Sequence, residues 1–178
     1  MSQKSSSVII SAIKNRRSIR SYSSQEIEPE KINAILHSAL VSPSARHERK
    51  WQLVVITNPD LISQLGKMKP HSHHVEEAQA VIVVISQEWQ YWVEDASIVA
   101  EHIWLEAENQ GLGSCWTQVR DSSTYDEISL SSEEYVKKVL DLQADARVLC
   151  MMPIGYPAEK LPPNDSNKLM QEKIVWKK

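Results

Sequence analysis

The run AVIVVIS, from Ala80 to Ser86, constrains the fold of this chain more than any other segment. Its residues do not alternate between apolar and polar, so the run predicts a strand that is buried on both faces. Such a strand needs helices on both sides of its sheet. The segments 51–57 and 147–152 predict two further strands, and 113–117 is a shorter candidate.

Amphipathic segments between these strands predict the helices. The clearest helix begins at Pro29, a residue that suits the first helical position. Its apolar residues fall on one face, at Ile32, Ile35, Leu36, Ala39 and Leu40. Further helices are expected at residues 8–16 and 59–67, after Asp95 as a cap, and after a capping box that begins at Ser131.

Turn-forming residues mark the ends of these elements. Ser42-Pro43-Ser44 ends the helix that begins at Pro29, and Gly111 follows the helix after Asp95. Pro153 and Gly155 are expected to turn the chain after the last strand. Helices that alternate with short apolar strands indicate an α/β or α+β fold, and we expect one domain over residues 1–178.

Charge and cysteine content exclude some classes of protein. The net charge is −3 and the pI is about 6.1, so we expect no nucleic-acid partner. The two cysteines, Cys115 and Cys150, are too few for a disulfide framework. The polar start resembles no signal peptide, and no aliphatic run is long enough to span a bilayer. We therefore expect a cytoplasmic protein without a membrane partner.

An arginine-rich segment, Arg16-Arg17-Ser18-Ile19-Arg20, lies where the first predicted helix ends. Arginine presents paired N–H donors, and each charge-assisted hydrogen bond contributes roughly 1.5–3 kcal/mol, so the segment suits a phosphate group. A solvated basic patch is the alternative, because arginine side chains usually stay exposed. The residues alone leave both interpretations open.

Four other segments carry weaker signals, and each has a plain structural interpretation beside the functional one. Residues 42–47 form a small-residue loop that a flat ligand can approach, or a simple connection. In residues 111–116, Cys115 is a candidate nucleophile, but a buried and inert thiol is favoured. Residues 71–74 are rich in histidine and form either a metal-binding loop or a solvated loop. Residues 152–157 form either a strand end that a ligand approaches or a simple turn.

The sequence contains no recognisable Ser-His-Asp array, phosphate loop or pair of acid–base carboxylates. Residues 111–116 are not a dinucleotide fingerprint either, since that motif needs a strand before a helix. This pattern favours an enzyme in which a cofactor carries the chemistry. We expect no metal and no obligatory catalytic side chain.

Taken together, these segments resemble the nitroreductase family of flavoproteins. AIKNRRSIRSY is very similar to the family's first motif, and SPSARHERKWQLVVIT resembles its second. WVEDASIVAEHIWLEAENQGLGSCW resembles the central helix and the following strand of short members. MMPIGYP resembles the last-strand motif, and KLMQEKIVW the closing segment. The five motifs follow the family's order from about Val8 to Trp176.

The resemblance implies an α+β fold, with a mixed and mainly antiparallel sheet flanked by helices, in an intertwined homodimer with FMN at its interface. The residues that it implies for the phosphate and ribityl chain are Arg16, Arg17, Ser18, Arg20 and Lys168. The partner chain would contribute Pro43, Ser44, Ala45 and His47, and the flavin ring would lie against Pro153, Ile154 and Gly155. The implied activity passes hydride from NADH or NADPH through FMN to a nitroaromatic, a quinone or a similar flat electrophile.

Two positions depart from the family pattern. His47 stands where asparagine is usual, and Arg49 where glutamine is usual. Those amides commonly help to hold the flavin, so the departures keep open a non-catalytic flavin-binding protein. A scaffold that binds no flavin is a third hypothesis, and the retained arginine segment argues against it. Because residues 113–133 form a short stretch, we expect a modest lid and an exposed cleft.

Overall fold

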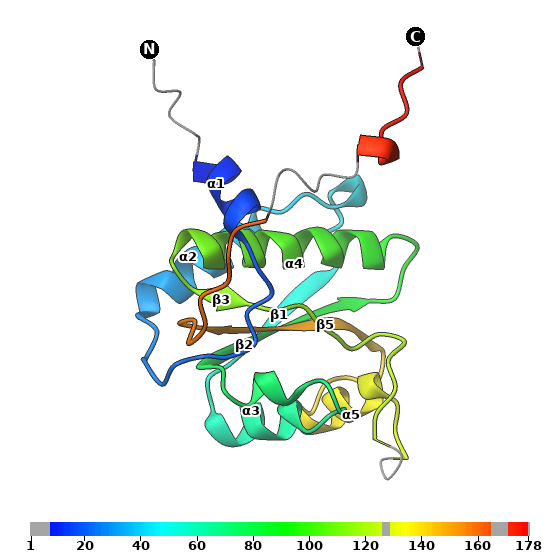
Figure 1. The fold of residues 1–178 in the computed structure, drawn as a ribbon. Coiled ribbons are helices and arrows are strands. Elements are labelled where there is room, and N and C mark those ends of the chain that lie inside the picture. Colours follow the sequence, from blue (N-terminus) through cyan, green and yellow to red (C-terminus); the bar gives the residue numbers. More distant parts are fainter. Residues whose placement is uncertain (1–7, 126–128, 165–170, 178) are drawn as a thin grey trace, which may run out of the picture.

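The computed structural model describes residues 8–125, 129–164 and 171–177, and it places helices on both sides of one sheet (Figure 1). The helices are α1 (Val8–Asn15), α2 (Pro29–Leu40), α3 (Pro59–Gly66), α4 (Trp92–Asn109) and α5 (Ser132–Val139). The strands are β1 (Trp51–Ile56), β2 (Ala80–Gln87), β3 (Gly113–Ser114), β4 (Thr117–Gln118) and β5 (Ala146–Gly155). Short 3-10 turns are η1 (Ala45–His47), η2 (His73–Val75) and η4 (Gln171–Lys173).

The sheet is antiparallel in every strand pair that the structure describes. Its order is β1-β2-β5-β3, and β4 also pairs with β5. An isolated parallel bridge joins Ser18 to Ser114. The α+β fold with a mainly antiparallel sheet, which the family resemblance implies, is therefore confirmed.

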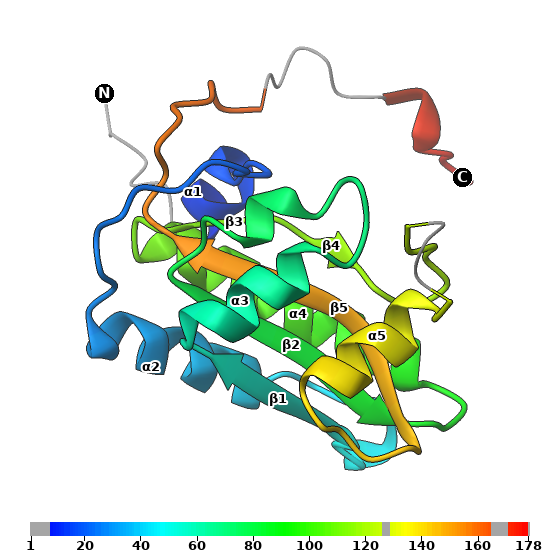
Figure 2. The same ribbon diagram turned by 90° about the horizontal axis from the view of Figure 1, so that it is seen from below.

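Strand β2 is buried on both faces, as its sequence predicts. Helices α2 and α4 lie over one face of the sheet, and α3 and α5 cover the other (Figures 1 and 2). Alternate β2 residues pack into two separate apolar clusters, with Ala80, Ile82 and Val84 on the α4 side and Val81, Val83 and Ile85 on the α3 side. Burial of each large aliphatic side chain contributes roughly 1.5–3 kcal/mol to stability. Because its side chains enter both clusters, β2 joins the two halves of the core.

Local capping signals set several helix starts. Pro29 is the first residue of α2, and Asn58 Oδ1 accepts hydrogen bonds from Asp60 N and Leu61 N at the start of α3. At α5 the predicted capping box is confirmed, because Ser131 Oγ accepts from the Glu134 backbone while the Glu134 side chain accepts from the Ser131 backbone. Short-range sequence patterns therefore mark where these helices begin.

The prediction that Asp95 caps the long helix is wrong. Helix α4 begins earlier, at Trp92, with Tyr91 in the cap position. Trp92 is buried in the core cluster, so packing of its indole extends the helix by one turn. Asp95 therefore lies inside the first turn, and its side chain contacts a distant loop instead of its own helix.

Two strand predictions also change. The predicted strand 113–117 is two short strands, β3 and β4, with a break between Ser114 and Thr117. Strand β5 does not end before Pro153 but continues to Gly155. The two findings are connected, because Pro153 lies opposite the break, where the sheet is already interrupted on the β3 and β4 side.

Among the residues that the structure describes, the helices are too short or too polar to span a lipid bilayer.

Candidate functional site

The segment from Arg16 to Tyr22 packs across the ends of β3 and β5. Ile19 N donates a 3.0 Å hydrogen bond to Ser114 O, and Ile19 and Tyr22 are each only 6% exposed. The segment therefore lies beside the end of β5 that carries Gly155. The structure brings together the first and the last groups of residues that the sequence predicts for the site.

Two glycines permit this close packing. A Cβ atom on Gly113 would lie 2.7 Å from Ile19 Cβ, and one on Gly155 would lie 2.8 Å from Tyr22 Cδ1. Neither distance is possible without movement of the backbone or the ring. Tyr22 Oη holds the segment in turn by donating a 2.7 Å hydrogen bond to Ile19 O. Burial raises the pKa of Tyr22 far above its usual value, so the phenol remains a donor.

Arg16 is held against helix α4. Its guanidinium carbon lies 4.0 Å from the centre of the Trp104 ring, and its Nε lies 3.8 Å from Glu101 Oε1. Contacts of this kind contribute at most about 1 kcal/mol each at an exposed site. They orient the Arg16 side chain at the junction of α1 and α4. Neither contact is a strong ion pair, so the guanidinium can still bind an anion.

Arg17 and Arg20 contact the chain that follows β5. Arg17 Nη1 donates to Pro162 O, and Arg20 N donates a 2.8 Å hydrogen bond to Glu159 Oε1. The Arg20 guanidinium is exposed and makes a long hydrogen bond of 3.4 Å to Ser18 O. The three guanidinium groups therefore do not converge on one point, but Arg20 can turn toward an anion without losing a strong contact.

The histidine-rich loop contributes His74, rather than His73, to this region. His74 Nε2 lies 2.9 Å from Thr117 Oγ1. Burial lowers the pKa of His74, and the positive charge of Arg20 lowers it further, so His74 is neutral at neutral pH. His73 is exposed, and its Nδ1 lies 3.0 Å from Glu76 Oε1. The two histidines thus have different partners.

Cys115 lies near the same arginine but is poorly suited to act as a nucleophile. It is 2% exposed, and burial raises the pKa of its thiol. The charge of Arg20 and a hydrogen bond with Ser18 oppose this rise without overcoming it. A nucleophilic cysteine needs a lowered pKa, so the geometry favours the inert interpretation of Cys115.

The predicted residues of the 42–47 loop are held by a different face of α4. Ala45 N donates a 2.8 Å hydrogen bond to Asp95 Oδ1, and Ser42 Oγ lies 2.8 Å from His102 Nδ1. Asp95 and His102 are seven residues apart, which places them on one face of the helix. The helix residues that contact Arg16 lie on another face. Within one chain, helix α4 therefore contacts the 42–47 loop and the arginine segment on two different faces.

The backbone of this loop is strained. Arg46, His47 and Arg49 have φ angles of 53°, 57° and 47°, in the left-handed region that costs residues with a Cβ roughly 1–2 kcal/mol each. Ser44 Oγ accepts a 3.0 Å hydrogen bond from Arg49 N and so closes the loop. Strained residues of this kind concentrate at functional sites, which favours a functional role for the loop.

The last predicted group of residues forms the end of β5. Pro153 pairs with Val81, and Gly155 pairs with Gly113 on the opposite side of the strand. The Ile154 side chain is fully buried in the cluster that faces α4, so a ligand at this strand end meets its backbone. Lys168, the remaining predicted phosphate ligand, lies outside the described residues.

Comparison with known proteins identifies the family. Residues 8–177 match the model of a family described as "Putative TM nitroreductase". The chain belongs to the nitroreductase family. A relative from Methanothermobacter thermautotrophicus, named "Putative NADH dehydrogenase/NAD(P)H nitroreductase", is 32% identical over 85% of this chain and 78% of that protein. The resemblance seen in the sequence motifs is therefore confirmed.

Solved nitroreductase structures share the whole fold. The "FMN-dependent Nitroreductase" of Clostridium difficile R20291 is 33% identical, covers 95% of this chain and 99% of its own, and superposes with a TM-score of 0.90. A protein from Bacteroides thetaiotaomicron, titled a "Putative NADH dehydrogenase/NAD(P)H nitroreductase", is 29% identical, covers 97% and 98%, and gives a TM-score of 0.86. The agreement extends over nearly the whole length of this family member.

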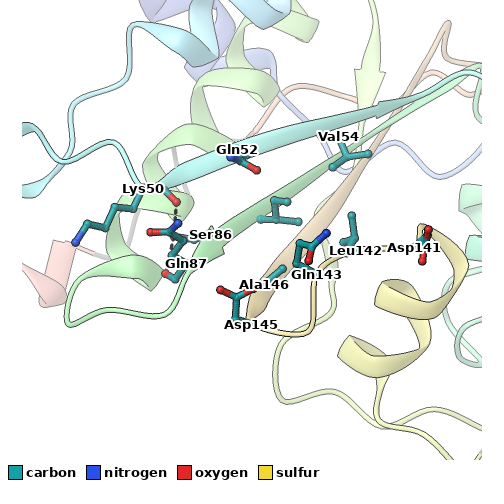
Figure 3. A pocket seen from close by; sticks show the side chains of 11 residues that line it. Lys50, Gln52, Val54, Ser86, Gln87, Asp141, Leu142, Gln143, Asp145 and Ala146 are labelled. Atoms are coloured by element: carbon teal, nitrogen blue, oxygen red, sulfur yellow. Dashed lines mark hydrogen bonds between the residues drawn. The ribbon is translucent and has the colours of Figure 1, made fainter.

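Figure 3 shows a pocket of about 370 Å³ in this nitroreductase-family chain. Ala146 lines it, so it lies at the start of β5, at the opposite end of the strand from Gly155. The start of β1, the end of β2 and the loop before β5 line it, and Ser86 Oγ donates a 3.1 Å hydrogen bond to Lys50 O there. Its polar side chains Gln52, Gln143 and Asp145 are exposed. It contains none of the residues predicted for the flavin, so it is separate from the candidate site.

Sequence reasoning missed two residues that the structure places near the predicted site of this family member. The adjacent histidines of the 71–74 loop look alike in sequence, but only the structure shows that His74, in the η2 turn, contacts Thr117. Aspartate is a common helix cap, so the sequence favoured that role for Asp95 and did not predict its contact with Ala45. The seven-residue spacing between Asp95 and His102 is visible in the sequence, but the loop that both residues contact cannot be predicted from it.

Proposed function

We propose that this chain is an FMN-dependent NAD(P)H oxidoreductase, which passes hydride from a nicotinamide through FMN to a nitroaromatic, a quinone or a similar flat electrophile. The observation that carries the proposal is the close packing of residues 16–22 against the Gly155 end of β5, which gathers the first and last predicted groups. Membership in the nitroreductase family, and a 33% identical relative titled FMN-dependent, support the cofactor.

The donor set of this region suits the phosphate of FMN. A phosphate dianion needs about two compensating charges, because an uncompensated charge is costly to bury. Arg16 and Arg20 would supply two once Arg20 turns toward the phosphate, and Ser18 would add a hydroxyl donor. The buried hydroxyl of Ser114, next to this segment, has no hydrogen-bond partner within the described part of the chain. Arg17 and Lys168 are the further predicted contacts.

The protein's own part in the reaction is to bind and orient. When bound, FMN supplies the chemistry by accepting hydride and passing it on. The arginine segment would hold the phosphate end, and the backbone of residues 153–155 would lie along the ring. Residues 43–47 of a second copy would complete the site from the other side. We expect no obligatory proton-transferring side chain, because the protons that accompany hydride transfer to the acceptor would come from water.

We also propose that the chain works as a homodimer. Ile174, Val175 and Trp176, in the tail after η4, are 53%, 73% and 80% exposed, which is unfavourable for a free monomer. An apolar groove of about 460 Å³ lies between α2 and β1, and Leu36, Leu40, Leu53 and Val55 line much of it. Strand β1 is the outer strand of the sheet. These features are complementary, so the tail of a second copy would cover the groove.

A non-catalytic flavin-binding protein is the alternative. The observation that favours it is the presence of His47 and Arg49 at positions where the family pattern has amides. Both lie in the strained loop, with positive φ angles. Such a protein would retain FMN but would not turn over.

Steady-state kinetics test the proposal. We expect the FMN-loaded protein to oxidise NADH or NADPH only when an acceptor such as menadione or a nitroaromatic is present, with parallel double-reciprocal plots, because both substrates use one site. Bound FMN without turnover would favour the alternative.

The cofactor assignment has its own test. FMN at 100 times its dissociation constant stabilises the folded state by about 2.7 kcal/mol, so it should raise the melting temperature. Arg20→Ala should remove most of this gain, whereas Lys14→Ala, an exposed basic residue six positions earlier, should keep it. A full shift in the Arg20→Ala protein would contradict the phosphate assignment.

A further inference from the structure

Asp95 is a buried carboxylate with an incomplete set of partners. The residue is 3% exposed, its Oδ1 accepts one hydrogen bond from Ala45 N, and its Oδ2 has no partner among the described residues. A buried carboxylate with a single hydrogen bond is unfavourable, and its place in the first turn of α4 offsets only part of this cost. Within the described part of the chain, the hydrogen bond that Asp95 accepts from outside its helix comes from the loop.

The hydrogen bond from Ala45 lies at the point where the loop changes direction. Ser44 is extended, with φ −139° and ψ 154°, and Ala45 is the first residue of η1. The first N–H of such a turn has no acceptor within the turn, so an outside acceptor is needed. The left-handed residues Arg46 and His47 follow directly. Asp95 therefore holds the last residue before the strained part of the loop.

A second contact on the same helix face makes the loop a fixed element. His102 Nδ1 lies 2.8 Å from Ser42 Oγ and 3.1 Å from Ser38 O. A carbonyl oxygen only accepts, so Nδ1 carries a proton and donates to the end of α2. With Asp95 at one point and His102 at the other, α4 contacts both the start and the middle of the loop.

We propose that Asp95 is a positioning residue, which fixes residues 42–49 of one copy in the conformation that contacts FMN bound to the other copy. The inference rests on the proposed function. The accepting oxygen of Asp95, and not its charge, is what the loop requires. Loss of the hydrogen bond releases a strained loop, and the affinity for FMN falls because the loop must then be ordered upon binding.

Three variants act on this hydrogen bond, and a fourth is the control. Asp95→Ala removes the acceptor, and Asp95→Asn keeps an acceptor of the same shape without the charge. Ala45→Pro removes the donor, and the residue before it, Ser44, has the extended conformation that a residue before proline prefers. Ser97→Ala is the matched control, because it removes the 2.6 Å hydrogen bond from Ser97 Oγ to Val93 O on the same helix.

Two measurements follow the loop and the ligand separately. Hydrogen exchange of the amides of residues 46–49 in the FMN-free dimer reports on the loop, and fluorescence titration with FMN gives the dissociation constant. For Asp95→Ala and Ala45→Pro we expect loss of amide protection and a rise of about tenfold or more in the dissociation constant. Asp95→Asn and Ser97→Ala should stay within about threefold of the unmodified protein. The double variant Asp95→Ala with Ala45→Pro should be no worse than either single variant.

The outcomes separate this inference from the proposed function. If the unmodified protein binds no FMN, both the proposed function and the inference fail. If it binds FMN and Asp95→Ala loosens the loop without weakening binding, only the inference fails. An Asp95→Asn protein that binds as poorly as Asp95→Ala would show that charge, not the hydrogen bond, matters, and would overturn it. If Asp95→Ala does not fold, Ala45→Pro tests the same bond from its other end through the amide protection of residues 46–49, and unchanged protection would overturn the inference.

Discussion

Arg49 carries a positive charge at a position where the motif that this chain resembles usually has a neutral glutamine. If the loop of residues 42–49 contacts FMN, the guanidinium of Arg49 favours negative charge on the reduced ring. We expect Arg49→Gln to lower the reduction potential of bound FMN, so that it becomes harder to reduce. Arg46→Gln, which removes a neighbouring charge with a similar φ of 53°, is the control. An equal potential in the unmodified and Arg49→Gln proteins, measured by spectroelectrochemistry, would contradict this role.

His74 gives stability a predictable dependence on pH. Burial and the charge of Arg20 lower its pKa in the folded state below the usual value of about 6.5, so the unfolded state binds more protons. The free energy of unfolding should therefore decrease as the pH falls below about 6.5, until it reaches the folded-state pKa. His74→Gln should flatten this decrease between about pH 7 and pH 5.

The matched control for that experiment is His73→Gln, which changes the exposed neighbour. Urea denaturation at several pH values measures both variants. A His74→Gln protein with the same acid dependence as the unmodified protein would show that His74 is not the group responsible.

At the scale of the element, Gly113 decides how closely the arginine segment approaches the sheet. Alanine there would place Cβ 2.7 Å from Ile19 Cβ, so the backbone near Ser18 and Arg20 must move. We expect Gly113→Ala to reduce stability by about 1–3 kcal/mol and to weaken FMN binding. Gly155→Ala should act alike, because its Cβ would meet Tyr22 on the same segment. Unchanged FMN affinity in both variants would contradict the role of this packing.

Elements with strong local signals were predictable from the sequence. The uninterrupted run of β2 indicated burial on both faces, and the capping box at Ser131 marked the start of α5. The break between β3 and β4 and the extension of β5 through Pro153 were not predictable, because they depend on which strands become neighbours. Packing of Trp92 likewise overrode Asp95 as a start signal for α4.

The candidate site was predictable only where the family motifs identified it. Arginine spacing alone did not distinguish a phosphate site from a solvated patch. The packing of Ile19 against Gly113 connects residues that are far apart in sequence, and no local pattern reveals it. The contact between Asp95 and Ala45 is similarly long-range, since the two residues belong to elements separated by β1, α3 and β2.

For the whole molecule, the exposed apolar tail makes a prediction about assembly. If the tail of one copy covers the groove between α2 and β1 of another, Trp176→Asp should weaken the dimer, and Val55→Asp in the groove should have the same effect. Lys177→Asp, next to the tail tryptophan, controls for the added negative charge. Sedimentation velocity over a range of concentrations measures the equilibrium. A monomeric unmodified protein, or a dimer that resists both substitutions, would contradict this arrangement.

The most direct test of the central claim is an anaerobic visible spectrum of the purified protein, taken after loading with FMN and gel filtration, and again after addition of NADH or NADPH. We expect the protein to retain FMN and its absorbance to bleach with at least one reduced nicotinamide. Retained FMN that does not bleach would contradict the oxidoreductase and leave a flavin-binding protein. Loss of FMN on the column would contradict the flavin site itself.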